Sequence, residues 1–178
     1  MIIRQALAAS LVAAIALAAP AAIAQETEPP MTADRLIRIV MALDPEADMA
    51  GPGLEMTIAD VPILIVMDPG ANRMRAMVPI ASAEGLTEAD LLRMMQANFD
   101  SALDARYAVA NGRVWGVFLH PLAELERDQL ISGLAQVVSV AQTYGSFYSS
   151  GAARFGSGDS VQLHRELLEE LLDRGEAL

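Results

Sequence analysis

The sequence predicts an α+β protein in which helices pack on a mostly antiparallel, five-stranded sheet. Three observations carry this prediction. The dipeptide Asn111-Gly112 lies between two apolar runs, which is typical of a hairpin turn. Three segments begin with the spacing of a capped helix. Short apolar strands separated by turn residues lie between the first two of these segments. The expected order of elements is α-β-β-β-α-β-β-α, followed by an amphipathic helix.

The first helix is predicted to begin at a capped start and to run to about Leu43. Thr32 is suited to accept a hydrogen bond from the first turn, and Met31 and Leu36 have the spacing of a hydrophobic staple. Three strands are then expected over residues 54–58, 61–67 and 74–80. The second of these is almost wholly apolar, which predicts a central strand covered on both faces. Pro79 in the third strand indicates an edge position or a β-bulge.

Two more helices show the same start signal. Thr87 is the expected cap of a helix that runs to Phe99 and has an apolar side made of Leu91, Met94, Met95 and Phe99. Glu126 is a poorer cap for the longest predicted helix, residues 127–144. Its core-facing stripe is Leu130, Leu134, Val137, Ala141, Tyr144 and Tyr148.

Between these helices, residues 105–119 are predicted to form a hairpin around Asn111-Gly112, because a type I′ turn needs positive φ at both central positions. A two-residue turn places Tyr107 opposite Gly116. It also places five side chains on one face, which either the second predicted helix or another chain is expected to cover. We take these five as candidate partner-binding residues: Arg106, Arg113, Trp115, Val117 and Leu119.

The chain begins with the pattern of a secretory signal. Arg4 precedes an apolar run, and Ala22-Ile23-Ala24 is a small-residue cleavage pattern. We expect residues 1–24 to be a signal peptide cleaved near Ala24, and the mature protein to be periplasmic or secreted. The expected organisation is then a linker at 25–31, the α+β domain at 32–149, a Gly/Ser linker at 150–159 and an amphipathic helix at 160–178. That helix has three possible fates: docking on its own domain, docking on a second copy, or no docking.

Charge and composition exclude several classes of partner. The formal net charge is −11, which disfavours nucleic acid and anionic lipid as partners. Stable membrane insertion after signal removal is not expected, because Pro20 interrupts the apolar run and no positively charged cluster follows it. The chain has no cysteine, and no lysine is present for Schiff-base or P-loop chemistry.

No motif for catalysis, a cofactor or a metal stands out, so no catalytic, cofactor or metal residue is predicted. His120 is more consistent with a loop histidine than with a general base, and His164 with an edge position than with a proton switch. Asp44, Glu46, Asp48 and Glu55 have the spacing of a calcium loop. Met49 occupies the position that needs glycine in such a loop, which favours solvated turn acids.

The pattern from residue 32 to about 144 resembles the YbjN family, whose fold is similar to that of the type III secretion chaperones. The likeness rests on the strand Val61-Pro62-Ile63-Leu64-Ile65, the helix start Leu86-Thr87-Glu88-Ala89-Asp90-Leu91-Leu92 and the hairpin Asn111-Gly112-Arg113-Val114. The resemblance implies a chaperone-like or regulatory protein without an agreed activity. Type III secretion chaperones are cytosolic dimers that hold an extended segment of a partner, and the export signal departs from that pattern.

The leading hypothesis is a non-enzymatic, exported binding, chaperone-like or regulatory module that acts through an apolar sheet face. We expect a homodimer, formed through the helix at 88–99 and the adjacent hairpin, and an extended protein segment as a further partner. Two alternatives remain: a small periplasmic enzyme with an unrecognised serine or carboxylate site, and a weak calcium-dependent envelope protein.

Overall fold

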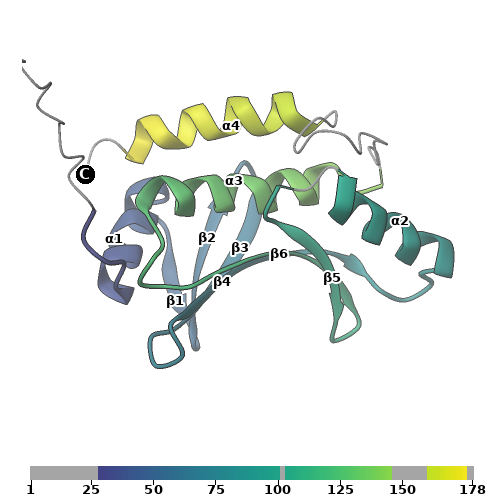
Figure 1. The fold of residues 1–178 in the computed structure, drawn as a ribbon, viewed down its shortest axis with the longest axis horizontal. Coiled ribbons are helices and arrows are strands. Elements are labelled where there is room, and N and C mark those ends of the chain that lie inside the picture. The colour runs from purple at the N-terminus through teal and green to yellow at the C-terminus, as the bar shows by residue number, and fades with distance from the viewer. Residues whose placement is uncertain (1–27, 101–102, 146–159, 176–178) are drawn as a thin grey trace, which may run out of the picture.

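The computed structural model describes residues 28–100, 103–145 and 160–175. In these ranges the chain forms four helices and six strands (Figure 1). In order they are α1 (Ala33–Leu43), β1 (Asp48–Ala50), β2 (Gly53–Ile58), β3 (Val61–Asp68), β4 (Arg73–Ser82), α2 (Glu88–Asp100), β5 (Arg106–Ala110), β6 (Arg113–His120), α3 (Arg127–Gln142) and α4 (Ser160–Gly175). The predicted signal peptide and the Gly/Ser linker lie outside the described residues, as do residues 25–27 of the linker at 25–31.

All strands belong to one antiparallel sheet with the order β1-β2-β3-β4-β6-β5. The predicted α+β class is confirmed, whereas the predicted number of five strands is wrong. The missed strand is β1, which pairs Asp48 with Glu55 and Ala50 with Gly53 across a tight turn. Its three residues are too few to show an alternating pattern.

The hairpin formed by β5 and β6 has the predicted register. Tyr107 pairs with Gly116 and Ala110 with Arg113, and the turn residues Asn111 and Gly112 have φ of 53° and 69°. The register between β4 and β6 shifts between Pro79 and Ala81, so Pro79 marks a bulge in an internal strand. Of the two predictions made for Pro79, an edge position or a β-bulge, the bulge is confirmed.

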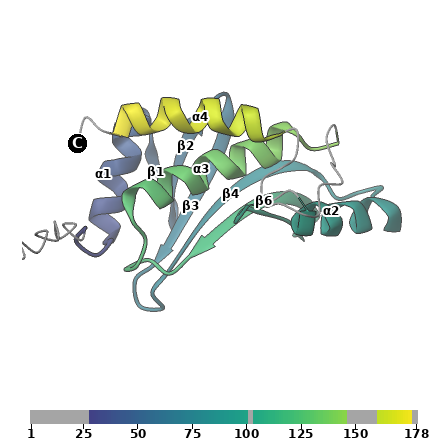
Figure 2. The ribbon, with the colours of Figure 1, turned by 45° about the horizontal axis from the view of Figure 1, so that its top comes forward.

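The helices lie on one side of the sheet. Both views place α3 along the sheet and α4 beyond α3, with α1 at the β1 end and α2 at the β5 end (Figures 1 and 2). Because α3 lies between the sheet and α4, every residue from Gly133 to Ser139 is buried. Gly133 is required for this packing, since a Cβ there would lie 2.5 Å from the ring of Phe118.

Helix α4 docks on its own domain. Leu167 and Leu171 belong to the main hydrophobic core, and Leu171 is fully buried. Arg174 pairs with Glu170 within the helix and donates a hydrogen bond to the carbonyl of Leu43 in α1 over 3.4 Å. Of the three possible fates of this segment, the structure therefore has the first.

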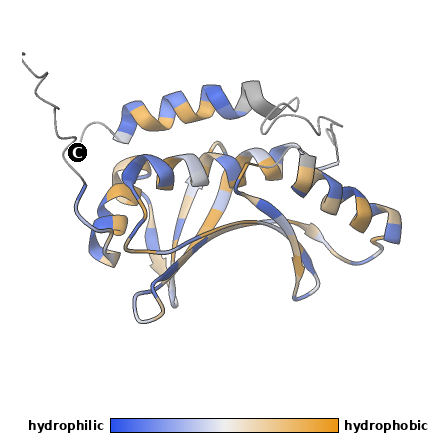
Figure 3. Ribbon diagram, viewed as in Figure 1, coloured by the Kyte–Doolittle hydropathy of each residue, from blue (hydrophilic) through white to orange (hydrophobic). Residues whose placement is uncertain are grey.

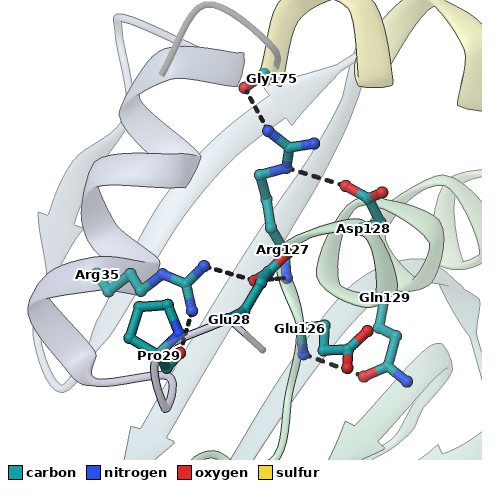
Figure 4. A network of polar contacts seen from close by, with 8 residues as sticks. All are labelled: Glu28, Pro29, Arg35, Glu126, Arg127, Asp128, Gln129 and Gly175. Atoms are coloured by element: carbon teal, nitrogen blue, oxygen red, sulfur yellow. Dashed lines mark hydrogen bonds and ion pairs between the residues drawn. The ribbon is translucent and has the colours of Figure 1, made fainter. Parts of the chain in front are cut away.

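A polar network joins the starts of α1 and α3 to the end of α4 (Figure 4). The carboxylate of Glu28 pairs with Arg35 of α1 and accepts a hydrogen bond of 3.0 Å from the backbone N–H of Arg127 at the start of α3. The guanidinium of Arg127 donates to the carbonyl of Gly175 and pairs with Asp128. The hydrogen bond from Arg127 is the main cause that lowers the pKa of Glu28.

The predicted helix starts are confirmed, and one predicted end is wrong. Thr32 accepts a hydrogen bond from Arg35, and Thr87 exchanges hydrogen bonds with Asp90. Helix α3 ends at Gln142 instead of Tyr144. The ring of Tyr144 instead packs against Tyr107, with 6.0 Å between ring centroids. Tyr148 lies outside the described residues.

Candidate binding surface

The sheet has one covered face and one open face. The buried side chains on the helix-facing side alternate along the strands with residues that point the other way. The covered face consists mainly of Leu54, Met56, Ile58, Ile63, Ile65, Met74, Ala76, Val78, Val114 and Phe118. We call the opposite side the open face, because none of the described helices lies over it.

The centre of the open face is an apolar patch. The ladder places Leu64, Met77 and Val117 side by side, and Leu119 and Trp115 continue the patch along β6. Leu119 is 50% exposed. The patch also contains Val66 and Pro79, which pair with Arg75 and Trp115. Within the described chain, residues 61–67 are covered by helices on one face only, since Leu64 and Val66 are half-buried.

Trp115 lies on β6, in the part of the open face that the β5–β6 hairpin forms. Its neighbours across the strands are Pro79 on β4 and Ala108 on β5. The indole N–H donates a hydrogen bond of 3.0 Å to the carbonyl of Ala110, which holds the ring toward the hairpin turn. The small Ala108 leaves the half-buried ring accessible, so a ligand on this face would contact it.

All five predicted partner-binding residues point to the open face. In the register of the sheet, Arg106 lies opposite Val117, and Arg113 lies opposite Ser82, two residues before Trp115. The two arginines therefore flank the apolar residues Trp115 and Val117. The guanidinium of Arg106 is engaged locally, because it donates hydrogen bonds to the carbonyls of Leu103 and Ala105. Arg113 is exposed.

A second apolar surface lies on α2, whose hydrophobic residues stand out beyond the sheet in Figure 3. We call this surface the α2 stripe; its members are Leu91 (41% exposed), Leu92 (62%), Met95 (54%) and Phe99 (75%). The sequence placed Leu91, Met95 and Phe99 with Met94 on one apolar side of this helix, and the structure leaves these three side chains exposed. Among the residues of this helix whose burial the structure describes, only Met94 and Ala97 are buried, against Tyr107 and Val114 on the covered side.

The α2 stripe lies next to the β5 edge of the sheet. Asn98 of α2 both donates to the carbonyl of Tyr107 over 3.1 Å and accepts from its N–H over 2.7 Å, so its amide substitutes for a neighbouring strand. On the helix, Met95 is three residues before Asn98 and therefore lies on the same side as Asn98. The stripe therefore borders the edge of the sheet and does not cover the Trp115 side of the open face.

A cavity of about 440 Å³ contains the groups that resemble a catalytic set. Its lining is Asp104, Phe118, Leu119, His120, Asp128, Gln129 and Ser132. Ser132 accepts a hydrogen bond from Gln136, whose amide also bonds to Asp104, and His120 bonds through Nδ1 to the carbonyl of Pro121. No hydrogen bond joins Ser132 to His120 among the described residues, so the nucleophile–base contact of a hydrolase is missing there.

Several other polar residues of the sequence have structural roles. Both carboxylate oxygens of Asp44 accept backbone hydrogen bonds, from Glu46 and from Thr57. This is the arrangement of a turn acid. Hydrogen bonds from Thr87 and from Asn72 lower the pKa values of Asp90 and Glu124, which lie at a helix start and in a loop. Neither group lines the cavity.

His164 of α4 lies against α3. Its Nδ1 atom is buried and has no hydrogen-bond partner among the described residues. Burial lowers the pKa of this histidine, and a hydrogen bond with the backbone of Ala135 opposes that effect. The neutral ring thus fits the interface between the two helices, whereas a charged ring does not.

Comparisons with known proteins give a fold and no sequence family. No family model matches the chain, and no curated protein matches it. A chain of the ExsC–ExsE complex matches with a TM-score of 0.50 and 13% identity, covering 62% of this chain and 91% of that chain.

Two further solved structures match less well. The HopA1–SchA chaperone–effector complex has a TM-score of 0.48 at 8% identity, covering 61% of this chain and 91% of that one. The Yersinia pestis type III secretion chaperone SycH, in complex with a stable fragment of YscM2, has a TM-score of 0.45 at 15% identity, covering 60% and 96%.

At 13% identity, the match to a chain of the ExsC–ExsE complex shows a shared fold. In the described part of the chain, no helix has the length and apolarity needed to span a bilayer.

Proposed function

We propose that the protein is a non-enzymatic, exported module that holds an extended segment of another protein on the open face of its sheet. The observation that carries this proposal is the apolar patch, which lies on a sheet face that no described helix covers. Contiguous exposed apolar surface of this kind is typical of an interaction site. The chaperone-like fold and the lack of a Ser132–His120 contact both favour binding over catalysis.

The proposal includes a homodimer and a relation to the YbjN family. The α2 stripe supports the homodimer, because its four large side chains are exposed and border an edge strand. The order of helices and strands supports the relation to YbjN. The sequence pattern around Ala22-Ile23-Ala24 supports export to the periplasm or the medium, with cleavage near Ala24.

Affinity capture from an envelope extract tests the binding role. Wild-type protein, Trp115→Ala and Met41→Ala serve as baits, and bound proteins are identified by mass spectrometry. Met41 is 48% exposed on α1 and therefore is a matched apolar control. We expect a partner that Trp115→Ala loses and Met41→Ala retains. A set of bound proteins that is the same for all three baits would contradict the proposed role of the open face.

Light scattering tests the homodimer separately. The mature protein should be a dimer, Phe99→Glu should be a monomer, and Met41→Glu should remain a dimer. Phe99 is 75% exposed, so the folded monomer tolerates the charge. A mature protein that is monomeric at 100 micromolar, or a Phe99→Glu variant that still dimerises, would refute the assignment of the α2 stripe.

A further inference from the structure

On the open face, the basic and the acidic residues lie on different strands. Strands β4, β5 and β6 contain four arginines and no acidic residue, although the whole chain has a net charge of −11. All four arginines, Arg73, Arg75, Arg106 and Arg113, point to the open face in the ladder. Strands β1, β2 and β3 have the opposite composition, with Asp48, Glu55 and Asp68 on this face and no arginine. The basic half coincides with the part of the apolar patch that contains Trp115, Val117 and Leu119.

Two of these arginines are available to a ligand. Arg75 and Arg113 are exposed, and neither forms an ion pair or a side-chain hydrogen bond with the residues that the structure describes. Arg35, Arg127 and Arg174, which do form ion pairs, all lie on helices. The guanidinium of Arg73 donates to the carbonyl of Asn72, and that of Arg106 is held by its own loop.

Arg75 and Arg113 bracket the apolar side chains of β6. Arg75 pairs with Leu119 at one end of β6, and Arg113 is the first residue of the same strand. A rise of about 3.3 Å per residue puts the two positions about 20 Å apart, with Trp115 and Val117 between them. An extended chain spans this length in about six residues.

We infer that the segment held on the open face is acidic, with carboxylates about six residues apart that pair with Arg75 and Arg113 and with apolar side chains between them that contact Trp115 and Val117. This inference rests on the proposed function and adds the chemistry of the partner. The acidic half of the face repels such a segment, so it lies along β6 and away from β2. Each carboxylate would be about as exposed as its arginine, so the charges select the partner more than they add affinity.

A second copy of the chain is a poorer occupant of this face. Figure 1 shows β4 and β6 bowed toward α3, so the open face lies on the inner side of the curve. Two inward-curved faces meet at their rims and leave their centres apart, whereas a single segment reaches the centre.

Trp115 provides a direct readout, because it is the single tryptophan of the chain. Two nine-residue peptides are titrated against the mature protein at low ionic strength while its emission is recorded. Both contain leucine at positions 4 and 6 and serine elsewhere. One has glutamate at positions 2 and 8, and the other has lysine there. We expect the acidic peptide to change the emission and to bind at least about fivefold more tightly than the basic one.

Variants of the two arginines test the pairing. In the Arg75→Glu, Arg113→Glu double variant the preference should invert, and in the Arg75→Gln, Arg113→Gln double variant it should vanish. Arg38→Glu, at an exposed position of α1, should keep the wild-type preference. Raising the salt to about 0.5 M should weaken the preference in the wild type, because the charges are screened within a few ångströms.

Three results would overturn the inference. Equal or tighter binding of the basic peptide would refute the claim that the bound segment is acidic, although the open face would still be a binding surface. A lack of response to either peptide up to millimolar concentration would refute an extended acidic ligand, while the capture experiment still decides the proposed function. A dimer that the Arg75→Glu, Arg113→Glu variant dissociates would assign the face to a second copy.

Discussion

Replacing Leu171 by alanine should destabilise the folded protein by about 3 kcal/mol. Leu171 is fully buried in the main core, between α4 and the rest of the domain. Three carbon atoms are removed, which costs about 2 kcal/mol of transfer free energy. A cavity that closes only in part adds about 1 kcal/mol. The magnitude is large only if α4 is docked on α3 in solution.

Urea denaturation followed by the emission of Trp115 measures this change. The matched control is Leu92→Ala on α2, where the side chain is 62% exposed, and where we expect a change within about 0.5 kcal/mol at low protein concentration. If Leu171→Ala and Leu92→Ala unfold at the same midpoint as the wild type, then α4 is not part of the cooperative core and the docked arrangement is refuted.

Three further predictions concern the edge strand, the helix interface and the core. Asn98→Ala should cost about 1 kcal/mol and speed amide exchange at Tyr107, since both hydrogen bonds to the β5 edge are lost; unchanged exchange would contradict the capping role. The pKa of His164 is lowered from 6.5 in the folded state, so the unfolded chain binds the proton more readily. Stability should therefore be complete above about pH 6.5 and fall as the pH decreases below it, and His164→Asn should remove this part of the pH dependence between pH 7.5 and 5.5. Gly133→Val should lower stability by at least about 2 kcal/mol, because its Cβ would lie 2.5 Å from the ring of Phe118; a wild-type unfolding midpoint would show that α3 packs differently.

Local signals in the sequence were sufficient for most of the fold. The Asn111-Gly112 turn determines the hairpin register, and with it the face on which Trp115 lies, because the side-chain period of a strand is two. The caps at Thr32 and Thr87 likewise depend on residues three positions away. Strand β1 was missed because its three residues carry no periodicity and exist as a strand only through pairing with β2.

The surface of α2 and the neighbours of β3 depend on tertiary structure. Leu91, Met95 and Phe99 have core-like helical spacing, and nothing local distinguishes an exposed apolar stripe from a buried one. The apolar run at 61–67 likewise indicated cover on both faces, whereas the helices pack on one side only. The separation of arginines and acids between strands was readable from the sequence, but only the strand order β3-β4-β6-β5 shows that the arginines share one face.

Site-specific photocrosslinking at Leu119 is the most direct test of the central claim, that the open face of the sheet binds another protein. A benzophenone amino acid replaces Leu119 on the open face or Met41 on α1, two positions of similar exposure, 50% and 48%. The protein is irradiated in the cells that produce it, and crosslinked peptides are sequenced. We predict crosslinks from position 119 to an acidic segment of another protein, and no such crosslinks from position 41. Equal crosslinking from both positions, or none from position 119, would contradict the account.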